Sequence, residues 1–315
     1  MEQAKELIRN WTWGPLHLSW LGLTELPELP EGLRSLYCQG NLLTRLPDTL
    51  PAGLKTLVCS NNWLTWLPDT LPAGLTELDC SNNQLTRLPD ILPAGLTRLV
   101  CSHIQLTTLP ETLPASLVYL SCSYNRLTHL PDTLPSSIQL IDCSYNQLTT
   151  LPETLPEGIT QLVCSHIQLT TLPETLPASL VYLSCSYNRL THLPDTLPSS
   201  IRLINCSYNQ LTTLPETLPE GLTQLYCSNN WLTTLSDTLP AGLRAFHCYG
   251  NNLPAMEDDE SIPDYVARVN AIAEAASQER IIQRCAVFFE ELAQKVWHPS
   301  RVERLMLAGV DMEEM

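Results

Sequence analysis

Basic side chains are scarce in this sequence, because 17 Lys and Arg residues stand against 33 Asp and Glu residues and the formal net charge is −16. Proteins that bind nucleic acid or anionic membranes present a basic patch or stripe. The composition therefore argues against both as partners. No run of 18 apolar residues is present either, so no membrane-inserted helix is expected.

The N-terminus also lacks the apolar segment of a Sec-type signal peptide. A secretion signal read by a specialised export system need not contain such a segment. We expect a protein of a reducing, cytoplasmic compartment, and a host cytoplasm, reached by export or as the site of a viral product, stays open as an alternative.

Cysteine is used with strict regularity. Eleven of the 12 cysteines recur every 21 residues, from Cys38 to Cys248. Such a period is the sequence signature of a solenoid, in which identical coils stack and bury one continuous core. Stacked coils lie roughly 4.8 Å apart with their side chains parallel, which is poor geometry for a disulfide. We predict a ladder of small, buried, free thiols.

Each coil follows the pattern L-x-x-L-x-C-x-x-N-x-L, first seen at Leu33, Leu36, Cys38, Asn41 and Leu43. The central part predicts a short strand with Leu36 and Cys38 inward and the residue between them outward. The rest of the coil, Leu-Pro-Asp/Glu-Thr-Leu-Pro, carries two prolines and predicts an extended, polyproline-like return. Its acidic residue recurs in every coil and predicts a solubilising row of carboxylates.

The asparagine of each coil is expected to turn the chain after the strand. Its buried amide can satisfy backbone groups of its own and neighbouring coils, forming a ladder. Ile104 and Ile167 replace it in two coils. We expect the polar ladder to be interrupted there and those coils to be weaker. Residues 99–160 and 162–223 are nearly identical, which indicates duplication of a three-coil block.

Three segments follow from this pattern. Residues 1–15 are expected to form a helical cap, with Ala4, Leu7, Ile8 and Trp11 on one face and with Trp11, Trp13 and Trp20 covering the end of the core. Residues 16–254 form the solenoid, with one partial and eleven full coils. Residues 255–315 form a helical segment.

Within that last segment, helical sequence runs to about Trp297, is broken at residues 298–300, and resumes as a short helix ending near Gly309. An apolar stripe around Cys285, at residues 281–289, suggests a helix core. The simplest role for the segment is a C-terminal cap of the solenoid, and a second binding module is the alternative.

Residues 214–233, Leu-Pro-Glu-Thr-Leu-Pro-Glu-Gly-Leu-Thr-Gln-Leu-Tyr-Cys-Ser-Asn-Asn-Trp-Leu-Thr, resemble the bacterial LPX-type subclass of leucine-rich repeats. Secreted effectors of the YopM and IpaH types carry such repeats, and giant-virus proteins have similar arrays. The resemblance implies an α/β repeat fold, a right-handed horseshoe with a parallel sheet on its concave face and helical caps. It implies host-protein binding, virulence and a host–pathogen setting as expectations.

IpaH-type effectors also carry a ligase domain with a Cys-x-Asp nucleophile. The C-terminal segment here is too short for that domain, and Cys285 is followed by Ala286 and Val287. Ligase activity is therefore not carried over.

The outward strand positions are the candidate binding surface, because a solenoid's sheet is its largest continuous face. Tyr and Arg are favoured at binding hot spots. The candidate protein-binding residues are Arg34, Tyr37, Lys55, Asp79, Arg98, Tyr119, Asp142, Tyr182, Arg202, Tyr226, Arg244 and His247.

No catalytic, cofactor-binding or metal-ligating residues are expected, since no phosphate loop, nucleophile motif or metal-ligand spacing is present. The sequence favours a non-enzymatic, effector-like scaffold that binds a host protein. Two alternatives remain: a structural or assembly component of a virion or surface whose solenoid packs laterally into homo-oligomers, and a ligase-type adaptor that recruits machinery through its C-terminal helices.

Overall fold

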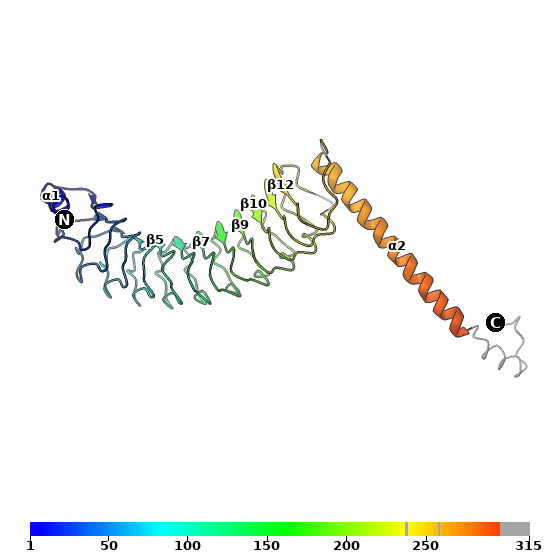
Figure 1. Ribbon diagram of the computed structural model, residues 1–315, viewed down its shortest axis with the longest axis horizontal. Helices are drawn as coiled ribbons and strands as arrows, with labels where there is room; N and C mark the ends of the chain where they lie inside the picture. The colour runs from blue at the N-terminus through cyan, green and yellow to red at the C-terminus, as the bar shows by residue number, and fades with distance from the viewer. Residues whose placement is uncertain (237–238, 258, 297–315) are drawn as a thin grey trace, which may run out of the picture. The chain divides into compact units, whose positions relative to one another are not determined.

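The computed structural model describes residues 1–236, 239–257 and 259–296, without the side chains of residues 293–296. Two compact units make up the chain, Met1–Ala255 and Met256–Met315. The first unit begins with α1 (Glu2–Arg9) and continues as a solenoid whose strands form one parallel sheet in sequence order (Figure 1). Its strands are β1 (Leu16–His17), β2 (Ser35–Tyr37), β3 (Thr56–Val58), β4 (Glu77–Asp79), β5 (Arg98–Val100), β6 (Tyr119–Ser121), β7 (Leu140–Asp142), β8 (Gln161–Val163), β9 (Tyr182–Ser184), β10 (Leu203–Asn205), β11 (Gln224–Tyr226) and β12 (Ala245–His247).

The predicted leucine-rich horseshoe is confirmed. From β2 onward each residue pairs with the one 21 positions later, as Leu36 does with Leu57. Figure 1 shows the strands on the concave side of the first unit's curve. The short strands follow from the repeat, because a leucine or isoleucine lies two residues before each strand from β2 onward and the returning chain holds prolines that cannot donate to a ladder.

The core is a stack of leucines and cysteines. The middle residue of each strand from β2 to β11 and the cysteine after it are 0 % exposed, for example Leu57 and Cys59. Burial raises the pKa of the Cys38 thiol to about 12 and also raises that of the Cys59 thiol well above its usual range. The thiols are free, as expected, and burial keeps them protonated and chemically inert. Cys248 is only half-buried, since its coil is the last.

A ladder of asparagine amides holds each coil to the next. Asn83 accepts a hydrogen bond from the Leu64 N–H at 2.9 Å, and its NH₂ group donates to the Cys59 and Cys80 carbonyls at 3.0 Å each. Asn83 is 7 % exposed. One side chain thereby satisfies buried backbone groups of two adjacent coils, which would otherwise cost about 1–3 kcal/mol each.

The ladder is interrupted where isoleucine replaces asparagine. By the repeat, Ile104 occupies the position whose amide would accept from the Leu85 N–H, and Ile167 stands in the same relation to Leu148. Asn125 in the next coil keeps the ordinary ladder bond from the Leu106 N–H at 2.9 Å and also accepts from the Ile104 N–H at 3.2 Å, but neither bond involves the Leu85 N–H. The interrupted ladder is thus present, while the local weakness stays a prediction.

The N-terminal end differs from expectation. Within α1 only Ala4 is buried, whereas Leu7 is 39 % exposed. Trp13 and Trp20 are 85 % and 71 % exposed, so the expectation that they cover the core was wrong. Trp20 instead lies over Gly40, which has φ +69°, and a Cβ at Gly40 would collide with the indole.

The described part of the second unit is one helix, α2 (Ile262–Val296). Ser261 caps it, accepting from the Asp264 N–H at 3.3 Å. Arg268 donates to Glu260 at 2.7 Å, and this hydrogen bond lowers the pKa of Glu260 to about 2. Neither helix described here combines the length and apolar character that a membrane crossing needs.

The predicted break at residues 298–300 and the short helix after it lie outside the described residues. The interpretation of the stripe around Cys285 as core was wrong, because Cys285 is exposed and Phe288 and Phe289 are 60 % and 64 % exposed.

Amide exchange tests the consequence of the interrupted ladder. The Leu85 and Leu148 N–H groups should exchange on the order of tenfold faster than their equivalents Leu64 and Leu127, because they lack the asparagine acceptor. Hydrogen exchange read by NMR measures this. The Ile104→Asn variant should slow exchange at Leu85 and leave Leu148 unchanged, and equal rates at all four leucines in the wild type would contradict the prediction.

Candidate protein-binding face

Two rows of side chains line the concave sheet. The first residue of each three-residue strand forms the leading row and the third residue forms the trailing row, while the middle residue points into the core. Most side chains of both rows are half-buried, although Ser121 and Ser184 in the trailing row are buried. The leading row is Ser35, Thr56, Glu77, Arg98, Tyr119, Leu140, Gln161, Tyr182, Leu203, Gln224 and Ala245, and the trailing row is Tyr37, Val58, Asp79, Val100, Ser121, Asp142, Val163, Ser184, Asn205, Tyr226 and His247.

Eight of the twelve candidate residues lie in these rows. The leading row holds Arg98, Tyr119 and Tyr182. The trailing row holds the other five, which are Tyr37, Asp79, Asp142, Tyr226 and His247. Whether they bind a protein stays a prediction.

The other four candidates, Arg34, Lys55, Arg202 and Arg244, lie one residue before a strand, so their placement on the strands was wrong. Two residues separate the leucines of L-x-x-L, and the first of them belongs to the turn that enters the strand. Arg202 donates to the Ser199 and Ile201 carbonyls of that turn at 3.0 and 3.1 Å. Leu140 and Leu203, which sequence reasoning missed, take the strand positions in their coils.

Glu77, Arg98 and Tyr119 form a connected chain across three neighbouring strands of the leading row. The Arg98 Nε lies 3.3 Å from the Glu77 carboxylate, and its guanidinium carbon lies 3.8 Å from the centre of the Tyr119 ring. The Arg98 side chain remains 42 % exposed. A cation over an aromatic face gains about 0.5–1 kcal/mol at such a site, so the arginine is held in place while still accessible.

The duplicated block supplies an internal comparison. Tyr182 has the same strand position as Tyr119, but its neighbour in the preceding strand is Gln161 rather than arginine. Arg98 and Gln161 lie immediately before the two nearly identical segments. The Arg–Tyr pair therefore occurs once on the face, although the tyrosine occurs twice.

The carboxylates of Asp79 and Asp142 accept hydrogen bonds from the turns that follow their strands. The Ser81 N–H donates to Asp79 at 3.0 Å, and the Ser144 N–H donates to Asp142 at 3.1 Å. This is the local turn that Asp side chains favour. These two acids therefore contribute to the fold as well as to the charge of the face.

Aromatic pairs mark both ends of the trailing row. At the N-terminal end His17 stacks on Tyr37, with ring centres 4.8 Å apart. At the other end Tyr226 meets His247 edge-on at 4.9 Å, and its hydroxyl donates to Gln224 at 2.9 Å. The face thus carries three separate aromatic groupings, of which the Arg98–Tyr119 pair is the one with a cation.

A continuous aromatic column lies beside the sheet and was missed by sequence reasoning. The rings of adjacent coils stack 4.0–4.1 Å apart and nearly parallel. The four tyrosines of the column are 39–45 % exposed. The column consists of His103, Tyr124, Tyr145, His166, Tyr187 and Tyr208.

Every ring of the column has a positive φ, as with Tyr145 at +54°. The other full coils place Asn or Gly at this position, for example Asn82 and Gly40. The Asn or Gly that precedes the ladder asparagine in those coils was the sequence signal for a left-handed backbone at this position, because these two residues adopt positive φ most readily. The stacking offsets a backbone conformation that is unfavourable for tyrosine.

Hydrogen bonds and burial perturb the ionisable groups of the column. A hydrogen bond with Tyr145 raises the pKa of Tyr124, and one with Tyr208 raises that of Tyr187. Partial burial between the Tyr145 and Tyr187 rings lowers the pKa of His166. The column therefore favours the neutral forms of Tyr124, Tyr187 and His166 over their charged forms.

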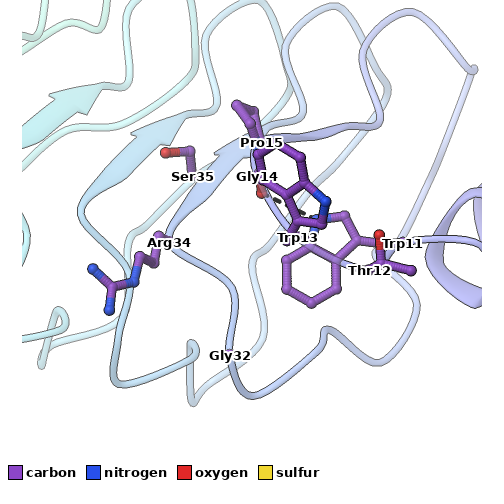
Figure 2. A pocket seen from close by; sticks show the side chains of 8 residues that line it. All are labelled: Trp11, Thr12, Trp13, Gly14, Pro15, Gly32, Arg34 and Ser35. Atoms are coloured by element: carbon purple, nitrogen blue, oxygen red, sulfur yellow. Dashed lines mark hydrogen bonds between the residues drawn. The ribbon is translucent and has the colours of Figure 1, made fainter.

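A shallow pocket of about 590 Å³ lies near the N-terminal end of the sheet, lined by Trp11, Thr12, Trp13, Gly14, Pro15, Gly32, Arg34 and Ser35 (Figure 2). The Trp11 Nε1–H donates to the Gly14 carbonyl at 3.0 Å. Figure 2 shows the Arg34 guanidinium pointing away from the two indoles. The pocket therefore offers an apolar wall without a charge aimed into it.

The described residues form no candidate metal site. No three His, Cys, Asp or Glu side chains among them gather in an arrangement that could hold a metal ion.

Comparison with known proteins places this geometry among leucine-rich repeats. The family model described as Leucine Rich Repeat matches residues 74–94. YopM from Yersinia enterocolitica WA-314 is 32 % identical over 82 % of this chain and 70 % of that chain, with a TM-score of 0.52. YopM from Yersinia pestis, described as a leucine-rich effector protein, is 32 % identical over 84 % of this chain and 91 % of that chain, with a TM-score of 0.51.

The functional domain of InlJ from Listeria monocytogenes, described as including a cysteine ladder, is 29 % identical. The match covers 72 % of this chain and 51 % of that chain, with a TM-score of 0.66. A comparison with curated proteins finds no match.

Substitution of Tyr145 tests how far ring stacking outweighs the unfavourable positive φ in the column. Tyr145→Ala should destabilise the solenoid by about 1–3 kcal/mol, because it removes two stacked contacts of about 0.5–1.5 kcal/mol each. Tyr145→Asn should cost less, since Asn tolerates positive φ. Urea unfolding followed by circular dichroism measures both, and equal losses in the two variants would show that backbone preference does not contribute.

The pH dependence of stability should contain a contribution from His166. Its folded pKa lies below the ordinary value of about 6.5, so the unfolded chain binds the proton more readily. That contribution is fully present above pH 6.5 and is lost as the pH falls from the unfolded value to the lowered folded pKa. His166→Asn should flatten the difference between melting temperatures at pH 7.5 and pH 5, and an unchanged difference would contradict the assignment.

Proposed function

This chain belongs to the leucine-rich repeat family, and from that premise we propose that it is a non-enzymatic, effector-like scaffold whose concave sheet binds a host protein. Leucine-rich repeat proteins are generally scaffolds for protein interaction, and the similar structures include effectors. The specific role of this chain and its partner are our proposal.

The observation that carries the proposal is the Glu77–Arg98–Tyr119 chain. Arg98 is accessible to a partner while its position is already fixed by a carboxylate on one side and a ring on the other. Ordering a free arginine on binding would cost about 0.5–1.5 kcal/mol, and part of that cost is removed here. Tyr and Arg dominate binding hot spots, and Arg98 and Tyr119 supply both residue types on adjacent strands.

The absence of basic excess favours a protein over nucleic acid as partner. With a net charge of −16, the chain would repel phosphate backbones, whereas a protein with a basic patch would be attracted to it. Arg98 and the half-buried tyrosines then supply contacts at the centre of the interface, and the carboxylates supply long-range attraction.

The effector assignment is supported by the 32 % identity to the two YopM proteins, one of which is described as an effector. The location we propose is a reducing cytoplasm, including that of a host cell, because the cysteine ladder is free and buried. A lateral structural component and a ligase-type adaptor are the other classes, and the experiments below distinguish the adaptor from a concave-face binder.

Affinity capture from host-cell lysate tests the proposal. The wild type should retain a protein that the triple variant Tyr119→Ala, Tyr182→Ala, Tyr226→Ala loses, since each removes an aromatic side chain from the concave rows. Trp66→Ala is the matched control, because Trp66 is 50 % exposed but lies eight residues beyond the end of β3. Capture by the triple variant equal to the wild type would overturn concave-face binding.

Single variants then measure how much Arg98 and Tyr119 each contribute to the affinity for the captured protein. Arg98→Gln copies the arrangement at Gln161 and Tyr182, and it should weaken binding about tenfold, as expected for a hot-spot residue of 1–2 kcal/mol. Tyr119→Ala should cost at least as much. Binding that persists in both variants but is lost on substitutions in α2 would favour the adaptor class.

A further inference from the structure

Helix α2 carries two apolar faces on different sides. Its first turns bury Tyr265, Val266 and Val269. Further along lies the distal stripe, which we define as Ile281, Ile282, Cys285, Phe288, Phe289 and Leu292. At 100° per residue the centres of the two faces are about 150° apart around the helix axis.

The distal stripe is therefore a surface of its own and not a continuation of the buried face. Its isoleucines and phenylalanines are 59–66 % exposed and Leu292 is 43 % exposed. The spacing of Ile281, Cys285, Phe288 and Leu292 follows the 4-3-4 interval of a helix that packs along a second helix. Monomeric proteins rarely expose a contiguous apolar surface of this kind, and such surfaces mark interaction sites.

We propose that the distal stripe is a self-association surface on which α2 of a second copy of this chain packs antiparallel. The charges beside the stripe identify the occupant. Arg284 lies beside its N-terminal half, about 100° around the helix from the stripe's centre, and Glu291 lies on the same side of its C-terminal half, about 120° from that centre. Antiparallel packing places Arg284 of one helix beside Glu291 of the other, at both ends of the interface, whereas an in-register parallel pair sets Arg284 level with Arg284 and Glu291 level with Glu291.

One register satisfies both the apolar and the charged positions. With the two-fold axis near residue 287, Ile282 faces Leu292 of the second copy and Cys285 faces Phe289 of the second copy. The two Phe288 side chains lie one residue to either side of the axis, and Arg284 lies beside Glu291 of the second copy. Such an isologous interface needs one self-complementary patch, which the distal stripe with its flanking charges provides.

Sedimentation equilibrium of the full chain over a range of concentrations tests the proposal. The wild type should approach twice the 35.2 kDa of one chain in the micromolar range. Ile282→Glu with Phe289→Glu should remain monomeric. Val287→Glu is the matched control, because Val287 is 57 % exposed but lies about 160° around the helix from the stripe's centre, and it should dimerise as the wild type does.

Disulfide trapping reports the orientation. Mild oxidation should link Phe289→Cys chains through Cys285, and the same variant with Cys285→Ser should stay unlinked. Efficient linking of wild-type chains through Cys285 alone would indicate a parallel pair and overturn the antiparallel register. The cysteines from Cys38 to Cys227 are buried and do not compete, and the half-buried Cys248 is replaced by serine in every chain tested.

Two results would overturn the assignment of a second copy of the chain as the partner of the distal stripe. A monomer at every concentration, with the Ile282→Glu/Phe289→Glu variant unchanged in mass, would exclude self-association. A monomer that dimerises only after removal of residues 297–315 would assign the distal stripe to the chain's own C-terminal residues. Neither result would affect concave-face binding, which rests on the first unit.

Discussion

The stacking of each coil on the next by backbone hydrogen bonds is the constraint on which the structure depends. A coil of 21 residues cannot satisfy its polar backbone alone, so many of its buried N–H and C=O groups find their partners in the neighbouring coil. The Asn83 amide meets this need by bonding groups of two coils at once. Leucine and cysteine then fill the space inside the coil, and the thiols are kept neutral by burial.

This constraint explains which features could be predicted from the sequence. The period, the core positions and the ladder follow from residues that must repeat, and each was recognisable because any other residue type there would leave a void or an unsatisfied polar group. The ends of the array were harder. Trp13 and Trp20 suggested a cover, but large aromatic side chains are compatible with exposed positions too, and the sequence contains no period there to decide between the two.

The candidate site was only partly predictable for a similar reason. In L-x-x-L both intervening residues are variable, so Arg34 and Lys55 were assigned to strands that begin one residue later. The aromatic column was missed because Tyr145 and its neighbours do not look like left-handed residues. Only the Asn and Gly at the same position in other coils, such as Asn82 and Gly40, reveal the backbone that the rings adopt.

The same regularity limits where specificity can arise. Duplication copied Tyr119 to Tyr182 along with the core, so the tyrosines alone give the face two equivalent points. Arg98 lies just outside the duplicated segment and has no counterpart at Gln161. A partner that recognises a cation held over an aromatic ring therefore meets one such point on the concave sheet, at β5 and β6. A break in the repeat thus provides a defined register for a binding partner, which an unbroken array would not.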